Sequence, residues 1–185
     1  MLTHYEDYEI YRKKDHVVLP QGIRQIADCA FHDFKRLVGI EIPDSVTRIG
    51  NEAFYGCSNL TSIKIPESVT NIGDHAFRDC TGLASIVIPD SVTSIGSGAF
   101  YNCYGLNSIE IPQSVTSIGY HAFRDCKSLA IVKLHVKQPS EARKLLLWAA
   151  LNQRSQISLF TPVGTGYAYR HDDYYNQFKE IIPKL

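Results

Sequence analysis

The sequence predicts an α/β solenoid, a single domain in which short repeats stack into a column, and three observations support this fold class. The first observation is that prolines recur every 23 residues. They are Pro20, Pro43, Pro66, Pro89 and Pro112. The second is that the blocks between these prolines are alike, and the third is that apolar and polar residues alternate just before each proline. Repeats of about 20–29 residues are typical of solenoids with one short strand in each repeat.

The repeated blocks are near copies of one another, with one more divergent copy at the start. The block from Ile65 reads IPESVTNIGDHAFRDCTGLASIV, and the block from Ile111 reads IPQSVTSIGYHAFRDCKSLAIVK. The divergent block from Leu19 reads LPQGIRQIADCAFHDFKRLVGIE. One block cannot bury its own apolar residues, so we expect the blocks to stack and bury them as one continuous core.

Each residue type in a repeat has an expected structural role. Ile63 and Ile65 alternate with polar residues, which predicts a short strand with one side facing the core. Pro66 has no N–H group and is expected to end that strand. We expect Gly73 to supply a turn that needs a positive φ. We expect Phe77 to lie in a short helical or 3₁₀ segment and to fill the widest part of the core.

Four of the five cysteines share one repeat position. They are Cys57, Cys80, Cys103 and Cys126. Free cysteine packs as a small apolar residue, and disulfide geometry is demanding, so we expect a reduced ladder in the core. Cys29 lies out of this register at a position expected to be accessible. It is the one candidate for a reactive or cross-linking thiol, and the alternative is an ordinary free cysteine in a terminal repeat.

The composition excludes several classes of protein. The chain has 185 residues, with 19 basic and 19 acidic side chains and a formal net charge of zero. A dedicated nucleic-acid-binding protein would carry a basic surface, so no nucleic-acid partner is expected. The longest apolar run, residues 145–151, is much shorter than the roughly 18 residues of a membrane span. The polar and acidic N-terminus is not a signal peptide.

The sequence contains no motif for a metal, a cofactor or catalysis. The seven histidines form no HExxH motif and no His/Cys pair at metal-binding spacing. The chain also lacks a GxSxG motif, a P-loop and a dinucleotide-binding motif. Because no pattern brings together a nucleophile, a base and an orienting residue, we do not expect an enzyme.

The repeat pattern LxxIxIPxSVTxIGxxAFxxCxxL resembles that of the BspA-type leucine-rich repeat family. The resemblance covers roughly residues 16–134, and residues 157–182 are similar to the closing segment of such proteins, a strand, a loop and a Tyr-rich short helix. It implies a short right-handed superhelix with about six parallel strands on its concave face and a cap at each end. We divide the chain into an N-terminal cap with the first strand (1–19), leucine-rich repeats (20–134) and a C-terminal helix with a capping segment (135–185).

The chain departs from the family at one repeat position. Serines stand where leucine-rich repeats usually have a ladder of asparagines. They are Ser45, Ser68, Ser91 and Ser114. A serine hydroxyl can still bond to local backbone groups, so we expect these residues to take over part of the role of the asparagines.

The resemblance also implies a function. The family consists mostly of bacterial surface and secreted proteins used in adhesion and protein recognition. For this chain it implies non-catalytic binding of a protein or glycan partner, without a cofactor, at a bacterial cell surface or outside the cell. One alternative is an intracellular, cytoplasmic interaction scaffold, consistent with Met1, the absent signal and the reduced cysteines. Another is an oligomeric structural component assembled through the C-terminal helix.

The concave face is the expected binding surface, because solenoids commonly bind partners there. Strand register places two rows of side chains on it. The first row is His16, Gly39, Ser62, Ser85, Ser108 and Ile131, and the second is Val18, Glu41, Lys64, Val87, Glu110 and Lys133. Glu41 is expected beside Lys64, and Glu110 beside Lys133, as favourable cross-strand pairs. These rows predict a mixed-charge binding surface with a small apolar centre at Val87. The alternative is that the charges only keep the sheet soluble.

Two further surfaces are candidates. One is a ladder of Tyr55, Arg78, Tyr101 and Arg124, in which cation–π contacts either stabilise an edge of the column or form a recognition strip. The other is a helix that we expect to start at Ser140, as its N-cap, and to run to about Asn152. That helix is apolar on all sides. One side is expected to cap the core, and the other, with Leu147, Trp148 and Leu151, would join a second copy in a homodimer.

Overall fold

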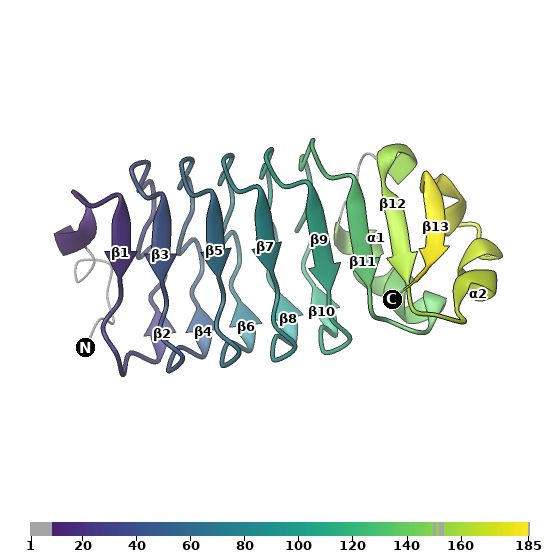
Figure 1. Cartoon of the computed structure of the whole chain (residues 1–185), viewed down its shortest axis with the longest axis horizontal. Helices are drawn as coiled ribbons and strands as arrows, with labels where there is room; N and C mark the ends of the chain where they lie inside the picture. The colour runs from purple at the N-terminus through teal and green to yellow at the C-terminus, as the bar shows by residue number, and fades with distance from the viewer. Residues whose placement is uncertain (1–8, 150, 152–153, 185) are drawn as a thin grey trace.

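The computed structural model describes residues 9–149, 151 and 154–184, and the side chains of residues 147–149 lie outside that description. Figure 1 shows these residues as an elongated column of stacked coils, with the repeats in sequence order along its length. Each repeat contributes one longer strand to a first ladder and one two-residue strand to a second ladder. The solenoid fold predicted from the sequence is therefore confirmed.

The longer strands form what we call the long-strand ladder. It contains β1 (His16–Val18), β3 (Gly39–Glu41), β5 (Ser62–Lys64), β7 (Ser85–Val87), β9 (Ser108–Ile111) and β11 (Ile131–Leu134), followed by β12 (Ser158–Thr161) and β13 (Glu180–Pro183). All paired strands are parallel. The hydrogen-bonded ladder has three sections, which are β1–β3, β5–β7 and β9–β11–β12–β13. The six repeat strands and β12 match the sequence prediction, whereas β13 was not predicted.

A second ladder of short strands, the short-strand ladder, was not predicted from the sequence. It is a five-stranded parallel sheet of β2 (Gln25–Ile26), β4 (Arg48–Ile49), β6 (Asn71–Ile72), β8 (Ser94–Ile95) and β10 (Ser117–Ile118). In each strand a polar residue precedes a buried isoleucine. Two residues are too few to show a period of two, so alternation along the sequence could not reveal these strands.

The segment around Phe77 corrects two predictions. Residues 74–79 form turns and not the expected helical or 3₁₀ segment. The positive φ expected at Gly73 falls instead on His75 (54°) and Asp79 (60°). Gly73 is required for a different reason, because a Cβ atom there would lie 2.6 Å from the backbone carbon of Gly50 in the previous repeat. These turns are held by bonds between repeats, such as Phe77 N–H to the Ala99 carbonyl at 2.7 Å.

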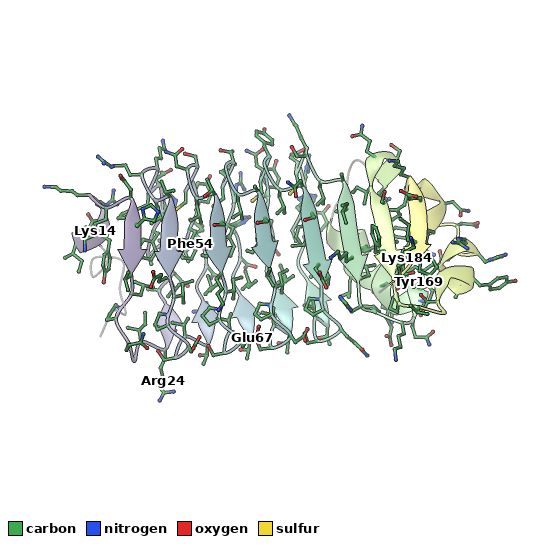
Figure 2. The ribbon with its side chains drawn as sticks, viewed as in Figure 1. Lys14, Arg24, Phe54, Glu67, Tyr169 and Lys184 are labelled. Atoms are coloured by element: carbon green, nitrogen blue, oxygen red, sulfur yellow. The ribbon has the colours of Figure 1, made fainter. Side chains whose placement is uncertain are left out.

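The core is a column of phenylalanine rings lined by the cysteine ladder. The rings of Phe31, Phe54, Phe77, Phe100 and Phe123 are buried and stack at centroid distances of 5.2 to 5.4 Å, and Figure 2 labels Phe54 within this column. Each core cysteine is a free, buried thiol, as predicted. Its Sγ donates to the phenylalanine carbonyl 26 residues earlier, as Cys126 does to Phe100 at 3.1 Å. Burial raises the pKa of the Cys126 thiol to about 12, so it stays protonated and unreactive at neutral pH.

The C-terminal cap begins with α1 (Pro139–Ala149), which packs against β10. The helix starts one residue before Ser140, so Ser140 is not its N-cap as predicted; proline is favoured at a first helical position. Ala142 and Leu146 are fully buried on the side predicted to cap the core. The prediction that the helix is apolar on all sides is wrong, because Glu141, Arg143 and Lys144 are exposed. The remaining elements are η2 (Arg154–Gln156), β12, α2 (Gly166–Arg170), η3 (Tyr175–Gln177) and β13. The division of the chain at residues 19/20 and 134/135 stays a prediction.

Of the three residues predicted to join a second copy, the structure describes the side chain of Leu151 alone. Leu151 is only 3% exposed, so its side chain is enclosed by its own chain and does not offer a surface to a second copy. The side chains of Leu147 and Trp148 lie outside the described residues.

Two tyrosine hydroxyls hold the C-terminal cap together. The hydroxyls of Tyr169 and Tyr175 donate to the carbonyls of Val136 and Pro139, both at 2.7 Å, and so connect α2 and η3 to the start of α1.

Candidate functional site

The outward side chains of the long-strand ladder form what we call the long-strand face. Strand pairing places both predicted rows on it, with His16 beside Gly39 and Val18 beside Glu41 in the first section. The intervening residues, such as Val17 and Ile63, point into the core. All residues predicted for this face are exposed or half-buried, and Val18 and Val87 are the most exposed apolar residues of the two rows, at 64% and 70%.

Strand register extends this face into the cap, which the sequence analysis did not recognise. Lys133 pairs with Phe160 of β12, and Phe160 pairs with Ile182 of β13. Both apolar side chains are half-buried and continue the second row. Part of the signal was present in the sequence, since Ser158-Leu-Phe-Thr-Pro162 has the same spacing from serine to proline as Ser62-Ile-Lys-Ile-Pro66, although its apolar and polar residues do not alternate in the same way.

The C-terminal half of the long-strand face holds a closed charge network. Glu110 accepts a bond from Lys133 at 3.1 Å, as predicted, and a second from His135 Nε2 at 2.7 Å. The hydrogen bond from His135 is the main cause that lowers the pKa of Glu110 below its ordinary value, with a smaller contribution from Lys133. The carboxylate is therefore satisfied within the protein.

The N-terminal half of the face is different. Glu41 and Lys64 lie on adjacent strands, but no ion pair joins these two described residues, so the predicted pair is not formed. A hollow of about 370 Å³ lies across β1, β3 and β5, with His16, Val18, Glu41 and Lys64 in its lining. Glu41 and Lys64 also line a second hollow of about 240 Å³.

Gly39 lies in the lining of the first hollow. It is the one position of the first row without a side chain. The His16 ring lies over it, because a Cβ atom on Gly39 would be 3.0 Å from His16 Cδ2. Figure 1 places β1, β3 and β5 at the N-terminal end of the column, far from the cap. The hollows on the predicted binding surface that involve Glu41 and Lys64 therefore lie at this end of the long-strand face.

The Tyr–Arg ladder forms contacts between repeats. The Arg78 guanidinium lies 4.5 Å from the Tyr101 ring centroid and 5.6 Å from that of Tyr55. Tyr55 in turn stacks on His32 at 4.6 Å, while Arg124 lies beside Asp125 and His121. All four predicted residues are half-buried. Arg78 therefore contacts the tyrosines of both neighbouring repeats, whereas Arg124 contacts residues of its own repeat. Both predicted roles of the ladder, stabilising an edge and recognition, stay predictions.

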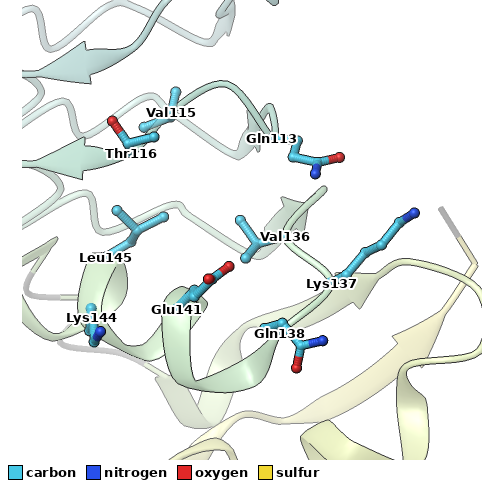
Figure 3. Close-up of a pocket in the computed structure, with 9 residues that line it drawn as sticks. All are labelled: Gln113, Val115, Thr116, Val136, Lys137, Gln138, Glu141, Lys144 and Leu145. Carbon is cyan, nitrogen blue, oxygen red and sulfur yellow. The ribbon is translucent and has the colours of Figure 1, made fainter.

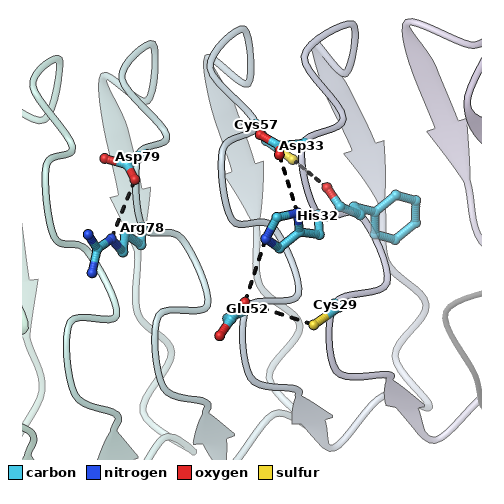
Figure 4. Close-up of polar contacts among 8 residues, drawn as sticks. Cys29, His32, Asp33, Glu52, Cys57, Arg78 and Asp79 are labelled. Carbon is cyan, nitrogen blue, oxygen red and sulfur yellow. Dashed lines mark hydrogen bonds and ion pairs between the residues drawn. The ribbon is translucent and has the colours of Figure 1, made fainter.

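Cys29 is half-buried and has a left-handed backbone, with a φ of 57°. Figure 4 shows its Sγ facing Glu52, at 3.9 Å from a carboxylate oxygen that also lies 3.6 Å from His32. Burial, and then the nearby Glu52 carboxylate, raise the pKa of the Cys29 thiol. A raised pKa lowers the thiolate fraction, so the environment favours an ordinary free cysteine over a reactive one. Among residues 9–149, 151 and 154–184, no cluster of three His, Cys, Asp or Glu side chains could hold a metal ion.

The fold and the exposed long-strand face define a leucine-rich repeat solenoid, a class of protein-interaction module. The family described as BspA type Leucine rich repeat region matches residues 8–130 in six copies, and the chain belongs to this family. No curated protein matches the chain.

Solved structures of bacterial proteins resemble the chain. A leucine-rich repeat protein from T. pallidum is 30% identical, with 94% of this chain and 88% of that chain covered and a TM-score of 0.69. One from Bacteroides ovatus is 27% identical, covers 91% of this chain and 45% of that chain, and has a TM-score of 0.62. The pneumococcal vaccine antigen PcpA, at 13% identity and a TM-score of 0.56, covers 92% of this chain and 56% of that chain and shares the fold. In the described part of the chain, no helix has the length and apolarity that a membrane crossing requires.

Proposed function

We propose that the protein recognises a partner protein through the N-terminal half of the long-strand face, without catalysing a reaction. The observation that carries this proposal is the pair of hollows on either side of Glu41 and Lys64. Members of the family and their structural neighbours are typically non-catalytic interaction modules. A glycan partner at this face is the alternative.

The chemistry of the hollows suits a protein surface. Val18 is an exposed apolar residue that a partner can bury, and the His16 ring, which lies over Gly39, offers a further flat surface beside it. Protein interfaces commonly have an apolar centre and a polar rim. Because Glu41 and Lys64 are not paired with each other, each can pair with an opposite charge on the partner. Such complementary charges mainly determine which partner binds and how fast.

We propose that this recognition takes place at a bacterial cell surface or outside the cell. The support is the family, which is often surface-associated in bacteria, and the similarity to leucine-rich repeat proteins of T. pallidum and Bacteroides ovatus. Fractionation of the source cells with an antibody against the chain tests this location. Recovery of the protein only in the cytoplasmic fraction would favour the intracellular scaffold instead.

Site-specific photo-crosslinking tests the binding surface. A photoreactive amino acid at Ser62, in the lining of the larger hollow, is expected to capture a partner protein. The matched control is the same amino acid at Thr93, which is exposed but lies beside the short-strand ladder. Capture of the same partner with equal yield at Thr93, or at Thr93 alone, would contradict the proposal.

A further inference from the structure

The second row of the long-strand face has a repeating order of side chains along the column. An apolar, an acidic and a basic residue follow one another on successive strands, and this order occurs twice. The two sets are Val18, Glu41 and Lys64, and then Val87, Glu110 and Lys133. Because Glu110 bonds to Lys133, the part of the row that can offer its charges to a partner runs from Val18 to Val87.

Four neighbouring strands, β1, β3, β5 and β7, carry this part of the row. Parallel strands lie about 4.8 Å apart, so Val18 and Val87 are separated by roughly 14 Å along the column. The core has a similar spacing, because the phenylalanine rings of successive repeats stack at 5.2 to 5.4 Å. A partner segment that uses the whole row must therefore place one contact about every 5 Å.

An α-helix fits this spacing better than an extended strand does. Its pitch is about 5.4 Å, so successive turns of a helix that lies along the column meet successive repeats. Three turns, about 11 residues, span roughly 16 Å and reach from Val18 to Val87. In an extended strand, residues on one side recur about every 6.7 Å, so a single side chain would face both Glu41 and Lys64. A helix instead offers a separate side chain to each charge.

The side chains of the row define the residues that such a helix presents. Val18 and Val87 are 64% and 70% exposed, so each can be buried by an apolar residue of the partner. Glu41 and Lys64 form no ion pair with each other among the described residues, so a basic and an acidic residue can face them. The first row has only serines on β5 and β7, and these short side chains let a helix lie close to the sheet.

A groove at the C-terminal cap offers a partner less apolar surface. It has a volume of about 520 Å³ and lies between the last repeat and α1, where Figure 3 shows Leu145 on one side and Val115 and Thr116 on the other. Its apolar residues Val136 and Leu145 are only 6% and 7% exposed. Burial of exposed apolar surface drives most protein association, so the long-strand face is the better docking surface.

We propose, on the basis of the recognition proposed above, that the partner docks through an α-helix that lies along the column from β1 to β7. One side of this helix carries an apolar residue over Val18, a basic residue over Glu41, an acidic residue over Lys64 and an apolar residue over Val87. These residues occupy positions i, i+4, i+7 and i+11, which share one face of a helix. The pattern is the same when the helix runs in the opposite direction.

Residue-level mapping of photo-crosslinks tests this helix. A photoreactive phenylalanine analogue, which keeps an aromatic ring at the first position, is placed at His16 and, in a second variant, at Ser85. Both positions belong to the first row and lie roughly 14 Å apart along the column. Mass spectrometry then identifies the partner residue that is joined to each. A helix should be joined at two residues about ten apart in its sequence, whereas an extended strand would give a separation of about four.

Charge reversal tests the side-chain pattern. Lys64→Glu should weaken binding more than about tenfold, because it brings two acidic groups together. Changing the partner acid that mapping places beside Lys64 to lysine should then restore the affinity to within about threefold of the original. Lys144→Glu, in the groove of Figure 3, is the matched control and should change the affinity less than about twofold.

The proposed helix is ruled out if the two crosslinked residues lie about four apart or in separate segments of the partner. It is also ruled out if no acid-to-lysine change on the partner rescues Lys64→Glu, or if Lys144→Glu weakens binding as much as Lys64→Glu does. The first and second results leave the recognition itself intact, because Ser62 still captures the partner. Absence of any captured protein at Ser62 refutes the recognition, and the docking helix with it.

Discussion

Glu41 and Lys64 in the N-terminal half of the long-strand face have the same residue types and the same spacing as Glu110 and Lys133 in the C-terminal half. Only the second pair forms an ion pair, at 3.1 Å. The two pairs also differ in the sheet. Strands β9 and β11 are hydrogen-bonded in register, whereas β3 and β5 belong to different sections of the ladder. Repeat spacing therefore identifies neighbouring residues, but it does not determine whether their side chains pair.

The comparison has a consequence for recognition. In the C-terminal half, the Glu110 carboxylate bonds to Lys133 and to His135, so a partner would have to break existing contacts to use it. In the N-terminal half, Glu41 and Lys64 line the two hollows and form no ion pair with each other. The same residue types thus serve the structure at one end of the face and are available to a partner at the other.

Filling the hollow should give the largest effect. We expect Gly39→Leu to weaken binding of the partner that crosslinking identifies by about 30-fold or more, the size of a hot-spot loss. The reason is that the leucine side chain would fill the hollow and displace the His16 ring, which lies over Gly39. Isothermal titration calorimetry with the purified partner measures this. Ser85→Leu, in the same row but outside the hollow, is the control, and equal losses in both variants would refute the special role of the hollow.

The two glutamates should differ in their effect on stability. Glu110→Gln is expected to lower the free energy of unfolding by about 0.5–1 kcal/mol, a small value because the Glu110 and Lys133 side chains are 45% and 41% exposed. Glu41→Gln has no ion pair with Lys64 to lose and should stay within about 0.3 kcal/mol of the wild type. Urea denaturation of both variants checks this, and similar losses would remove the distinction between the two halves.

The contribution of Glu110 to stability should depend on pH. The bond from His135 lowers the pKa of Glu110 below its usual 4.5, so the folded state holds this proton less tightly than the unfolded chain does. The stabilisation is therefore present above the unfolded value and is lost as the pH falls through the folded one. We expect the stability difference between wild type and Glu110→Gln to shrink from about pH 6 to about pH 3, and a constant difference would contradict this.

The repeats made most of the fold predictable. Because each residue of the block recurs, the Phe77 column, the cysteine ladder and the rows of the long-strand face could all be placed from spacing alone. Local backbone could not be placed in the same way. The positive φ was expected at Gly73 but falls on His75 and Asp79, since the glycine position is set by contact between repeats and not by the turn itself.

The candidate sites were predictable only in part. The residues of the long-strand face follow from register, and Gly39 is visible as the missing side chain of its row. The absence of an ion pair between Glu41 and Lys64 was not predictable, because their spacing and residue types are the same as those of Glu110 and Lys133. The bond of His135 to Glu110 forms where the repeats end, so neighbouring blocks do not predict it.

The affinity ratio of two matched variants tests the central claim most directly. Lys64→Ala and Lys133→Ala remove the same ammonium group from equivalent positions of the two halves. Calorimetry with the partner that crosslinking identifies is expected to show that Lys64→Ala lowers the affinity about tenfold and that Lys133→Ala lowers it less than about twofold. Unchanged binding by Lys64→Ala, or a larger loss for Lys133→Ala, would show that the N-terminal half of the long-strand face is not the recognition surface.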